Sequence, residues 1–260
     1  MSLDSLLHGR LGAVTNATAP STTSDLTAVF STENDGMVMT LATFALTLIL
    51  ELVSVQSMCA ILRQKNGQAL YAQALFCNVL NNGVLGPISY WLVIHNCVRP
   101  PFKSALERAA MVGAILIGHA IGYYLAHRGM HTRQLYWAHR FHHRFNVNVS
   151  PVVANAVSLA EYAIAYMLPF ITGSFLLHPD RASLFIAVAI VSMNNLLIHT
   201  PLLVELSSKL VPWWAVSTSD HFDHHKRLTT HWAAPTISID RLLVCVFGKP
   251  ASWGKEFKDA

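Results

Sequence analysis

Five long apolar stretches restrict this chain to a narrow set of folds. They cover residues 37–62, 70–98, 109–126, 152–177 and 183–198. Each stretch is near the roughly 20 residues that a helix needs to cross the hydrocarbon layer of a bilayer. The second is interrupted by Asn81, Asn82, Gly83 and Pro87, which predicts a kink. We therefore predict an all-α fold, a polytopic membrane bundle of four to five spans.

The composition agrees with a membrane protein. Of the 260 residues, 53% are hydrophobic and only 12% are charged, which is unusual for a soluble domain. The net charge of +4 is a small excess that flanks the apolar stretches, so no nucleic acid partner is expected. The four cysteines contain no CxxC pair, which argues against a disulfide framework and against a thiolate zinc site.

The basic residues predict the orientation of the chain. If each stretch crosses once, residues 63–69, 126–151 and 199–260 share one side and carry 13 of the 18 Lys and Arg residues. The positive-inside rule makes that side cytosolic. We accordingly divide the chain into a polar segment 1–36, lumenal or external, and a membrane domain 37–260. The sequon that begins at Asn16 falls on the non-cytosolic side.

Histidines cluster in three motifs. Five of the 14 lie between His127 and His143, as HRGMH at 127–131 and HRFHH at 139–143, and HFDHH at 221–225 repeats the HxxHH spacing. On a helix, residues three or four apart share a face, so each motif offers a chelating pair. Eight imidazoles exceed the four ligands of one tetrahedral zinc, which favours two metal ions. The predicted topology brings all three motifs to the cytosolic face, forming a histidine-rich cap that holds a dimetal site.

A metal transporter or a metal-binding protein is the alternative that these residues leave open. His119 lies two turns before His127 on the same helical face, and Glu51 and Glu161 are ionisable residues inside apolar stretches. A transporter would place its ligands in mid-membrane, on helices that face one another. Loose metal buffering, in contrast, does not require the HxxHH spacing twice.

The motifs resemble those of a known enzyme superfamily. HRGMHTRQLYWAHRFHHRFN at 127–146 and HFDHHKRLTTHW at 221–232 are similar to the histidine boxes of the fatty acid hydroxylase and sterol desaturase superfamily, and the resemblance is strongest over 110–248. It implies a membrane oxidoreductase with two iron ions, or zinc in a purified form. The implied reaction is O2-dependent hydroxylation, desaturation or demethylation of a membrane lipid.

The resemblance also implies partners and a location. The expected substrate is a sterol first, then a fatty acyl or sphingoid lipid, entering from the bilayer. Electrons would come from an external donor, cytochrome b5 or a similar carrier. In a eukaryote the membrane would be that of the endoplasmic reticulum, as expected for lipid biosynthesis.

Residue by residue, the resemblance implies nine metal ligands, the ninth being a histidine between the second and third boxes. They are His127, His131, His139, His142, His143, His199, His221, His224 and His225. Glu161 loosely matches a glutamate that the family places after the second box, once one residue is inserted.

Six further residues are candidates for supporting roles. Asp220 and Asp223 are expected either to orient ligand histidines or to cap a helix and face solvent. His231 departs from the usual pattern after the third box and is expected to be an extra ligand, a supporting residue or a packed histidine. His119, Asn194 and Asn195 approach the membrane interior, where they would line a substrate channel or form interhelical hydrogen bonds.

Overall fold

The computed structural model describes residues 34–102, 104–145 and 148–248. The chain divides into two compact units, 1–31 and 32–260. The first unit lies wholly outside the described residues, as do the Asn16 sequon and nearly all of the predicted polar segment 1–36. The described part of the second unit is helical and contains no β-sheet, which confirms the predicted all-α fold.

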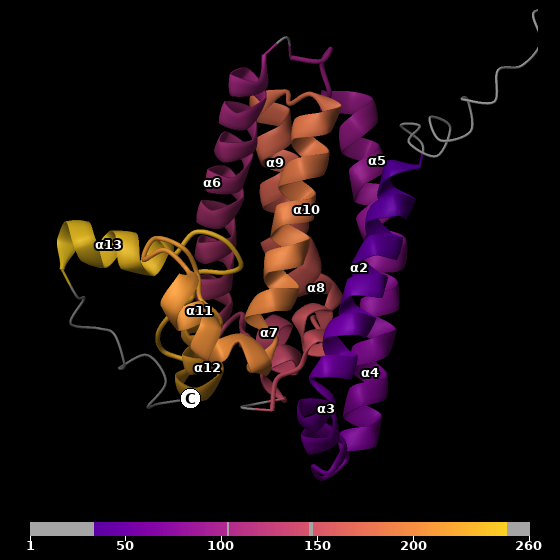
Figure 1. The fold of residues 1–260 in the computed structure, drawn as a ribbon, viewed down its shortest axis with the longest axis vertical. Helices are drawn as coiled ribbons and strands as arrows, with labels where there is room; N and C mark the ends of the chain where they lie inside the picture. Colours follow the sequence, from indigo (N-terminus) through magenta and orange to yellow (C-terminus); the bar gives the residue numbers. More distant parts are fainter. Residues whose placement is uncertain (1–33, 103, 146–147, 249–260) are drawn as a thin grey trace, which may run out of the picture. The chain divides into compact units, whose positions relative to one another are not determined.

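Long helices run up and down to form a bundle (Figure 1). Two of them pass through a π-helical turn without ending, at Asn81–Leu85 between α4 and α5 and at Tyr162–Met167 between α8 and α9. The first of these turns lies where the kink was predicted. The bundle is formed by α2 (Asp35–Val53), α4 (Gly67–Leu80) with α5 (Gly86–Cys97), α6 (Ala105–Met130), α8 (Leu159–Glu161) with α9 (Leu168–Leu177), and α10 (Arg181–Ile198).

Four of these helices are long and apolar enough to cross a membrane. They are α2, α6, the helix from Leu159 to Leu177, and α10. The α4–α5 helix covers the second predicted stretch, but the polar run at Asn81 and Asn82 lowers its hydropathy. By length and composition the described residues contain four candidate spans, which agrees with the predicted four to five.

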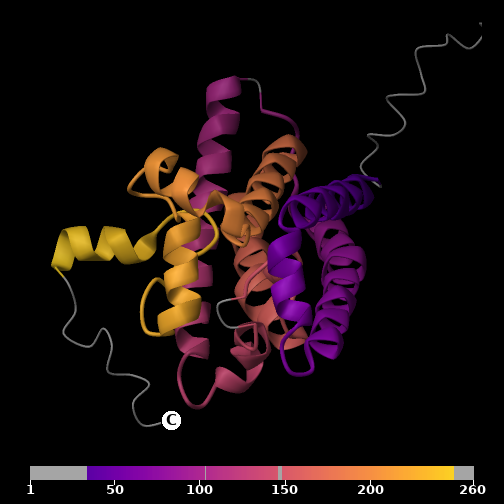
Figure 2. The same ribbon diagram turned by 60° about the horizontal axis from the view of Figure 1, so that its bottom comes forward.

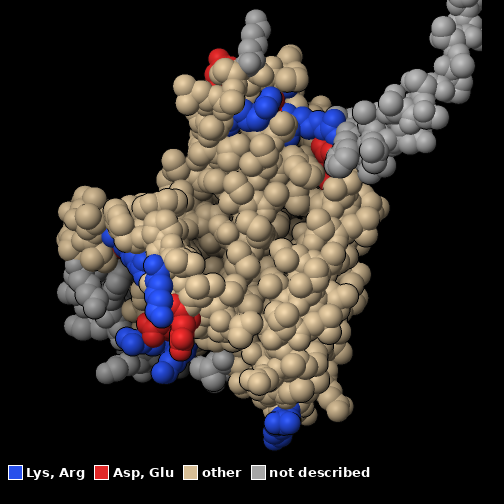
Figure 3. All heavy atoms as spheres, in the orientation of Figure 1, with Lys and Arg blue, Asp and Glu red and all other residues tan. Residues whose placement is uncertain are grey.

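The first bundle helix, α2, has the reverse of the polarity pattern of a helix in a soluble protein, with polar side chains buried and apolar ones exposed. Its buried residues are polar: Asp35, Thr40, Thr43, Thr47 and Glu51. Large apolar side chains of the same helix face outward, including Met37, Leu41 and Leu52. Lipid solvates such a surface, whereas water would not. On the face drawn in Figure 3, charged side chains gather near the top, on the lower left and at the bottom, and the broad surface of the bundle between them is uncharged.

Ion pairs join the helices at the end where α2, α6 and α10 begin. Arg181 contacts Asp35 at 2.6 Å, and Arg108 contacts Asp180 at 3.4 Å. Burial alone would raise the pKa of Asp180, but hydrogen bonds from Ser183 and from the Phe102 backbone, with the Arg108 charge, hold that pKa below its usual value. These contacts fix the turn between α9 and α10.

Short elements cover the opposite end of the bundle. They are α3 (Val55–Leu62), α7 (Tyr136–His143), the 3₁₀ turn Pro151–Asn155, α11 (Val204–Leu210), α12 (Thr218–Arg227) and α13 (Ile239–Phe247). Helix α12 packs against α10 and α11. Turning this end forward shows α12 lying beside the lower part of α6, while α13 extends away from it (Figure 2).

Candidate metal centre

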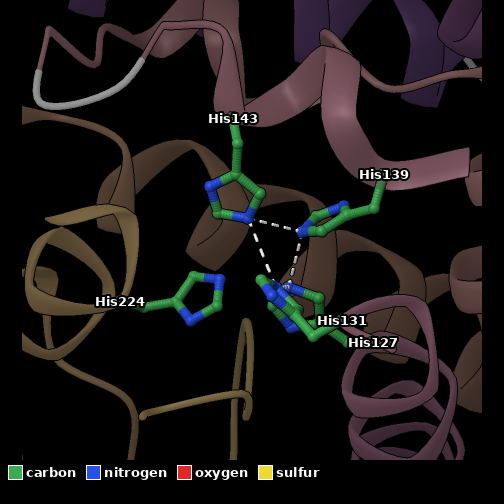
Figure 4. A group of neighbouring side chains, drawn as sticks. All are labelled: His127, His131, His139, His143 and His224. Atoms are coloured by element: carbon green, nitrogen blue, oxygen red, sulfur yellow. Dashed lines mark hydrogen bonds between the residues drawn. The ribbon is translucent and has the colours of Figure 1, made fainter. Parts of the chain in front are cut away.

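All nine predicted ligand histidines meet at this end of the bundle, in two groups. Within each group the nearest ring nitrogens lie within 4.8 Å of one another, and every residue is buried. The first group contains His127, His131, His139, His143 and His224, and the second contains His142, His199, His221 and His225. In the first group the rings turn toward a common centre from three sides (Figure 4).

The second and third motifs are each divided between the two groups. His139 and His143, four residues apart on α7, join the first group, while His142 between them joins the second. Helix α12 does the reverse: its pair four residues apart belongs to the second group, and His224 belongs to the first. Each HxxHH motif thus gives two histidines to one group and one to the other. Helices α7 and α12 therefore each supply histidines to both groups, which places the two groups side by side.

The ring nitrogens are spaced as ligands of one ion would be. Nε2 of His143 lies 2.7 Å from Nε2 of His139 and 3.3 Å from Nε2 of His131. In the second group, Nε2 of His221 lies 2.9 Å from that of His199 and 3.1 Å from that of His225. Imidazole nitrogens about 2.0–2.1 Å from a shared ion would be roughly 3 Å apart.

Hydrogen bonding alone does not account for these contacts. A neutral imidazole has one donor and one acceptor, so three or more Nε2 atoms that converge on one point cannot all be satisfied by each other. Nε2 of His224 is buried and has no hydrogen-bond partner. Buried polar atoms without a partner are costly. The donor set therefore fits two metal ions that accept imidazole, such as iron, zinc, copper or nickel.

Burial keeps the ligand rings neutral. It lowers the pKa of His199 to about 4, and burial together with the neighbouring imidazoles lowers the pKa of His143 and His225 well below the usual value. A neutral imidazole presents the lone pair that a metal ion requires. The centre is therefore in its metal-binding protonation state at neutral pH.

The second ring nitrogen of four ligands is held by a specific acceptor. Nδ1 of His139 lies 2.7 Å from Oε1 of Glu161, which is fully buried. Backbone carbonyls hold the others: Nδ1 of His127 at 2.6 Å from Trp232 O, of His199 at 2.7 Å from Asn195 O, and of His224 at 2.8 Å from Thr230 O. Such bonds place the proton on Nδ1 and leave Nε2 free to bind a metal.

Asp220 and Asp223, which were considered for an orienting role, make other contacts in the structure. Asp220 forms a capping box with Ser217 and accepts a 2.6 Å hydrogen bond from Arg241, which is the helix-capping alternative. Asp223 pairs with Arg227 at 2.8 Å. His231 belongs to neither histidine group and lies 3.8 Å from Asp220 and 3.7 Å from Asp223.

The three residues expected to line a substrate channel do not lie together. Asn195 lines a cavity inside the bundle, but His119 and Asn194 are not among its lining residues. His119 is buried behind Phe170, which does line the cavity, with the two ring centroids 4.4 Å apart. His119 and Asn194 do not line this cavity, and their channel role stays a prediction. The interhelical role holds for Asn195, which donates to the Ala154 carbonyl at 3.1 Å.

Glu161 contacts a candidate ligand, yet the site residues predicted from the sequence do not include it. It lies in the first turn of a bundle helix, and Ser158 accepts a hydrogen bond from its N–H as the helix cap. A lone glutamate within an apolar stretch was the available signal, together with the loose match to a family glutamate. Its partner is 22 residues away in the sequence, so spacing could not identify it.

Comparison with known proteins gives one result. A family model described as fatty acid hydroxylase matches residues 112–244, which is 133 of the 260 residues and contains all nine histidines. No curated protein and no solved structure matches the chain.

Proposed function

Since the chain belongs to the fatty acid hydroxylase family, we propose that it is a membrane-bound lipid oxygenase with a histidine-held pair of iron ions. One observation carries the proposal: three motifs at the end of an apolar bundle supply nine buried histidines, divided into two compact groups. The first group would hold one ion and the second group the other.

The chain's own residues prepare the centre for oxidation of a lipid. A pair of bound iron ions supplies the redox chemistry by which O2 is activated toward an unreactive C–H bond. The nine imidazoles provide a neutral shell, and their burial excludes water. Glu161 and the three carbonyls hold each ring so that Nε2 points inward.

Electron balance requires a second protein. Hydroxylation of a C–H bond by O2 takes up two electrons and two protons and releases one water, and desaturation takes up the same number and releases two waters. The donor in this proposal is cytochrome b5 or a similar one-electron carrier, which docks at the histidine end. The concentration of Lys and Arg on that side supports a cytosolic orientation. In a eukaryotic cell, we propose the endoplasmic reticulum as the membrane.

The substrate in this proposal is a lipid of the surrounding bilayer. Resemblance ranks a sterol first and fatty acyl or sphingoid lipids next, with hydroxylation, desaturation and demethylation as the possible reactions. A metal transporter is less well supported, because the histidines lie at the end of the bundle rather than in mid-membrane. Glu51, which suggested transport, is bound by the Val152 N–H at 2.9 Å and by Tyr71 at 3.0 Å.

Lipid analysis of a host that expresses the chain tests this function. We expect the wild type to add a hydroxyl group or a double bond to a lipid class, and His224→Ala to abolish that product. His95→Ala is the matched control, because His95 is exposed at the opposite end of the bundle and should leave the product unchanged. A product made equally by His224→Ala would overturn the proposal. So would an unchanged lipid profile with metal-loaded wild type.

A further inference from the structure

A cavity of about 90 Å³ lies within the bundle, among α2, α5, α9 and α10. It is separate from the histidine groups, since none of the nine histidines lines it. Its wall includes Thr40 and Thr43 of α2, Val93 of α5, and Leu184 and Ser192 of α10. The uncharged surface of the bundle is hollowed near the centre of the face drawn in Figure 3.

The cavity is long and narrow. Along α10 its lining runs from Leu184 to Asn195, which at about 1.5 Å per residue is roughly 16 Å. Its volume of about 90 Å³ is only several times the roughly 10–15 Å³ of such space that a cavity needs to hold one water molecule. Space spread over that length suits a single alkyl chain. A fused-ring sterol is wider than such a slot.

The two ends of the cavity differ in polarity. Toward the start of α10 the lining includes Leu184 and Val188, with Val93 and the polar Tyr90 from α5. Toward the histidine end the lining contains four polar side chains, those of Asn155, Tyr162, Tyr166 and Asn195. The histidine end is thus the richer of the two in polar side chains, which suits a molecule with an apolar tail and a more polar head.

The polar end of the cavity is adjacent to the metal centre. Asn195 lines the cavity with its side chain and accepts from Nδ1 of His199 with its carbonyl. Tyr166 packs against Tyr123 with ring centroids 5.1 Å apart, and Tyr123 packs against His127 at 5.2 Å. A chain in the cavity would therefore have its head-proximal carbons nearest the histidines.

We propose that the cavity among α2, α5, α9 and α10 binds the unbranched alkyl tail of the lipid substrate, with the terminal methyl near Val93 and Leu184. That the bound lipid is the substrate rests on the proposed function. The inference makes a single-chain acyl or sphingoid lipid the substrate class, in preference to a sterol. It also predicts oxidation near the head of the lipid rather than at its terminal methyl.

Photochemical labelling of the purified, metal-loaded protein tests the site without turnover. The probe is palmitic acid with a diazirine at its terminal carbon, used without reductant and mapped by mass spectrometry. We expect labelling on peptides that contain Val93 or Leu184, reduced by an excess of unmodified palmitic acid. A photoreactive cholesterol should not label these peptides.

Two neighbouring residues of α10 provide matched variants. Ser192 lines the cavity, whereas Met193 does not line it and is 45% exposed on the outside of the bundle. Ser192→Phe should reduce labelling at Val93 and Leu184 at least fivefold, and Met193→Phe should leave it unchanged. A second pair on α2, Thr43→Phe in the lining and Leu41→Phe outside it, repeats the test if Ser192→Phe does not fold.

The outcomes separate this inference from the proposed function. Labelling at Val93 and Leu184 that survives Ser192→Phe and Thr43→Phe would overturn the inference. Labelling confined to outward-facing residues such as Met193 would also overturn it. Preferential labelling by the cholesterol probe would also overturn it. In each of these cases a lipid product that depends on His224 would still support the oxygenase. Loss of that dependence, with labelling intact, would refute the oxygenase alone.

Discussion

At the scale of single residues, the centre depends on how its rings are held. An imidazole can rotate, and only a fixed acceptor at Nδ1 keeps Nε2 aimed at the metal position. Glu161 is the only side-chain acceptor among the four described above, and it bonds His139 at 2.7 Å in a fully buried site. The other three acceptors are carbonyls that no side-chain substitution removes directly. Glu161 is therefore the position where the support of the rings can be tested.

Glu161→Gln should weaken metal binding while preserving the shape of the side chain. The amide oxygen is a weaker acceptor than the carboxylate, so His139 is held less firmly, and loss of such a partner typically costs about 10–100-fold in affinity. Competition with a chelator measures the change. Glu205→Gln, on an exposed glutamate of α11, should bind metal like the wild type. Equal affinity in all three proteins would refute the orienting role.

At the scale of elements, polar side chains within the bundle hold the segment that joins α7 to α8. Asn78 donates to the Val152 carbonyl at 2.6 Å, and Asn81 donates to the carbonyls of Asn155 and Val157. Glu51 accepts from the Val152 N–H. The 3₁₀ turn of this segment lacks the hydrogen bonds of a longer helix, so buried side chains supply them. This segment lies between the second histidine motif and Glu161.

Asn78→Leu should destabilise the protein by about 1–3 kcal/mol, because it leaves the Val152 carbonyl with one fewer partner in a buried site. The unfolding temperature in detergent should fall accordingly. Asn96→Leu is the control, since Asn96 is exposed and bonds only within its own helix, to the Leu92 carbonyl. Unfolding temperatures that fall equally in the two variants would contradict this account of the segment.

Local periodicity explains which parts of the site could be predicted. The pairing of His127 with His131 follows from helix geometry, which also pairs His139 with either His142 or His143 and needs no tertiary information. The division of His142 and His224 between opposite groups depends on how α7 and α12 face each other, which spacing does not encode. The Trp232 carbonyl that holds His127 is 105 residues away in the sequence. The cavity likewise arises from four helices that only the fold brings together.

At the scale of the molecule, the arrangement of the helices separates two ends. The turn at Asp180 and the start of α6 lie at one end, and the nine histidines, α11 and α12 lie at the other (Figure 1). If α4–α5 crosses like its four neighbours, these ends emerge on opposite sides of the membrane. The positive-inside rule then predicts the histidine end in the cytosol.

Labelling of sealed microsomes with a membrane-impermeant maleimide tests this orientation. The Cys245→Ser background removes an exposed native cysteine. In it, Ser208→Cys on α11 should react without detergent, because Ser208 is exposed at the histidine end. Ala105→Cys, at the exposed start of α6, should react only after detergent is added. Reaction of both cysteines in intact microsomes, or of Ala105→Cys alone, would show that the orientation is wrong.

Metal analysis of the purified protein tests the central claim most directly. Two groups of buried histidines should hold about two iron ions per chain. Removal of one ligand from either group, by His143→Ala or His225→Ala, should lower that content clearly, and His95→Ala should retain it. A wild-type protein that binds one ion or none when supplied with iron, or two ions that both ligand variants retain, would contradict the account.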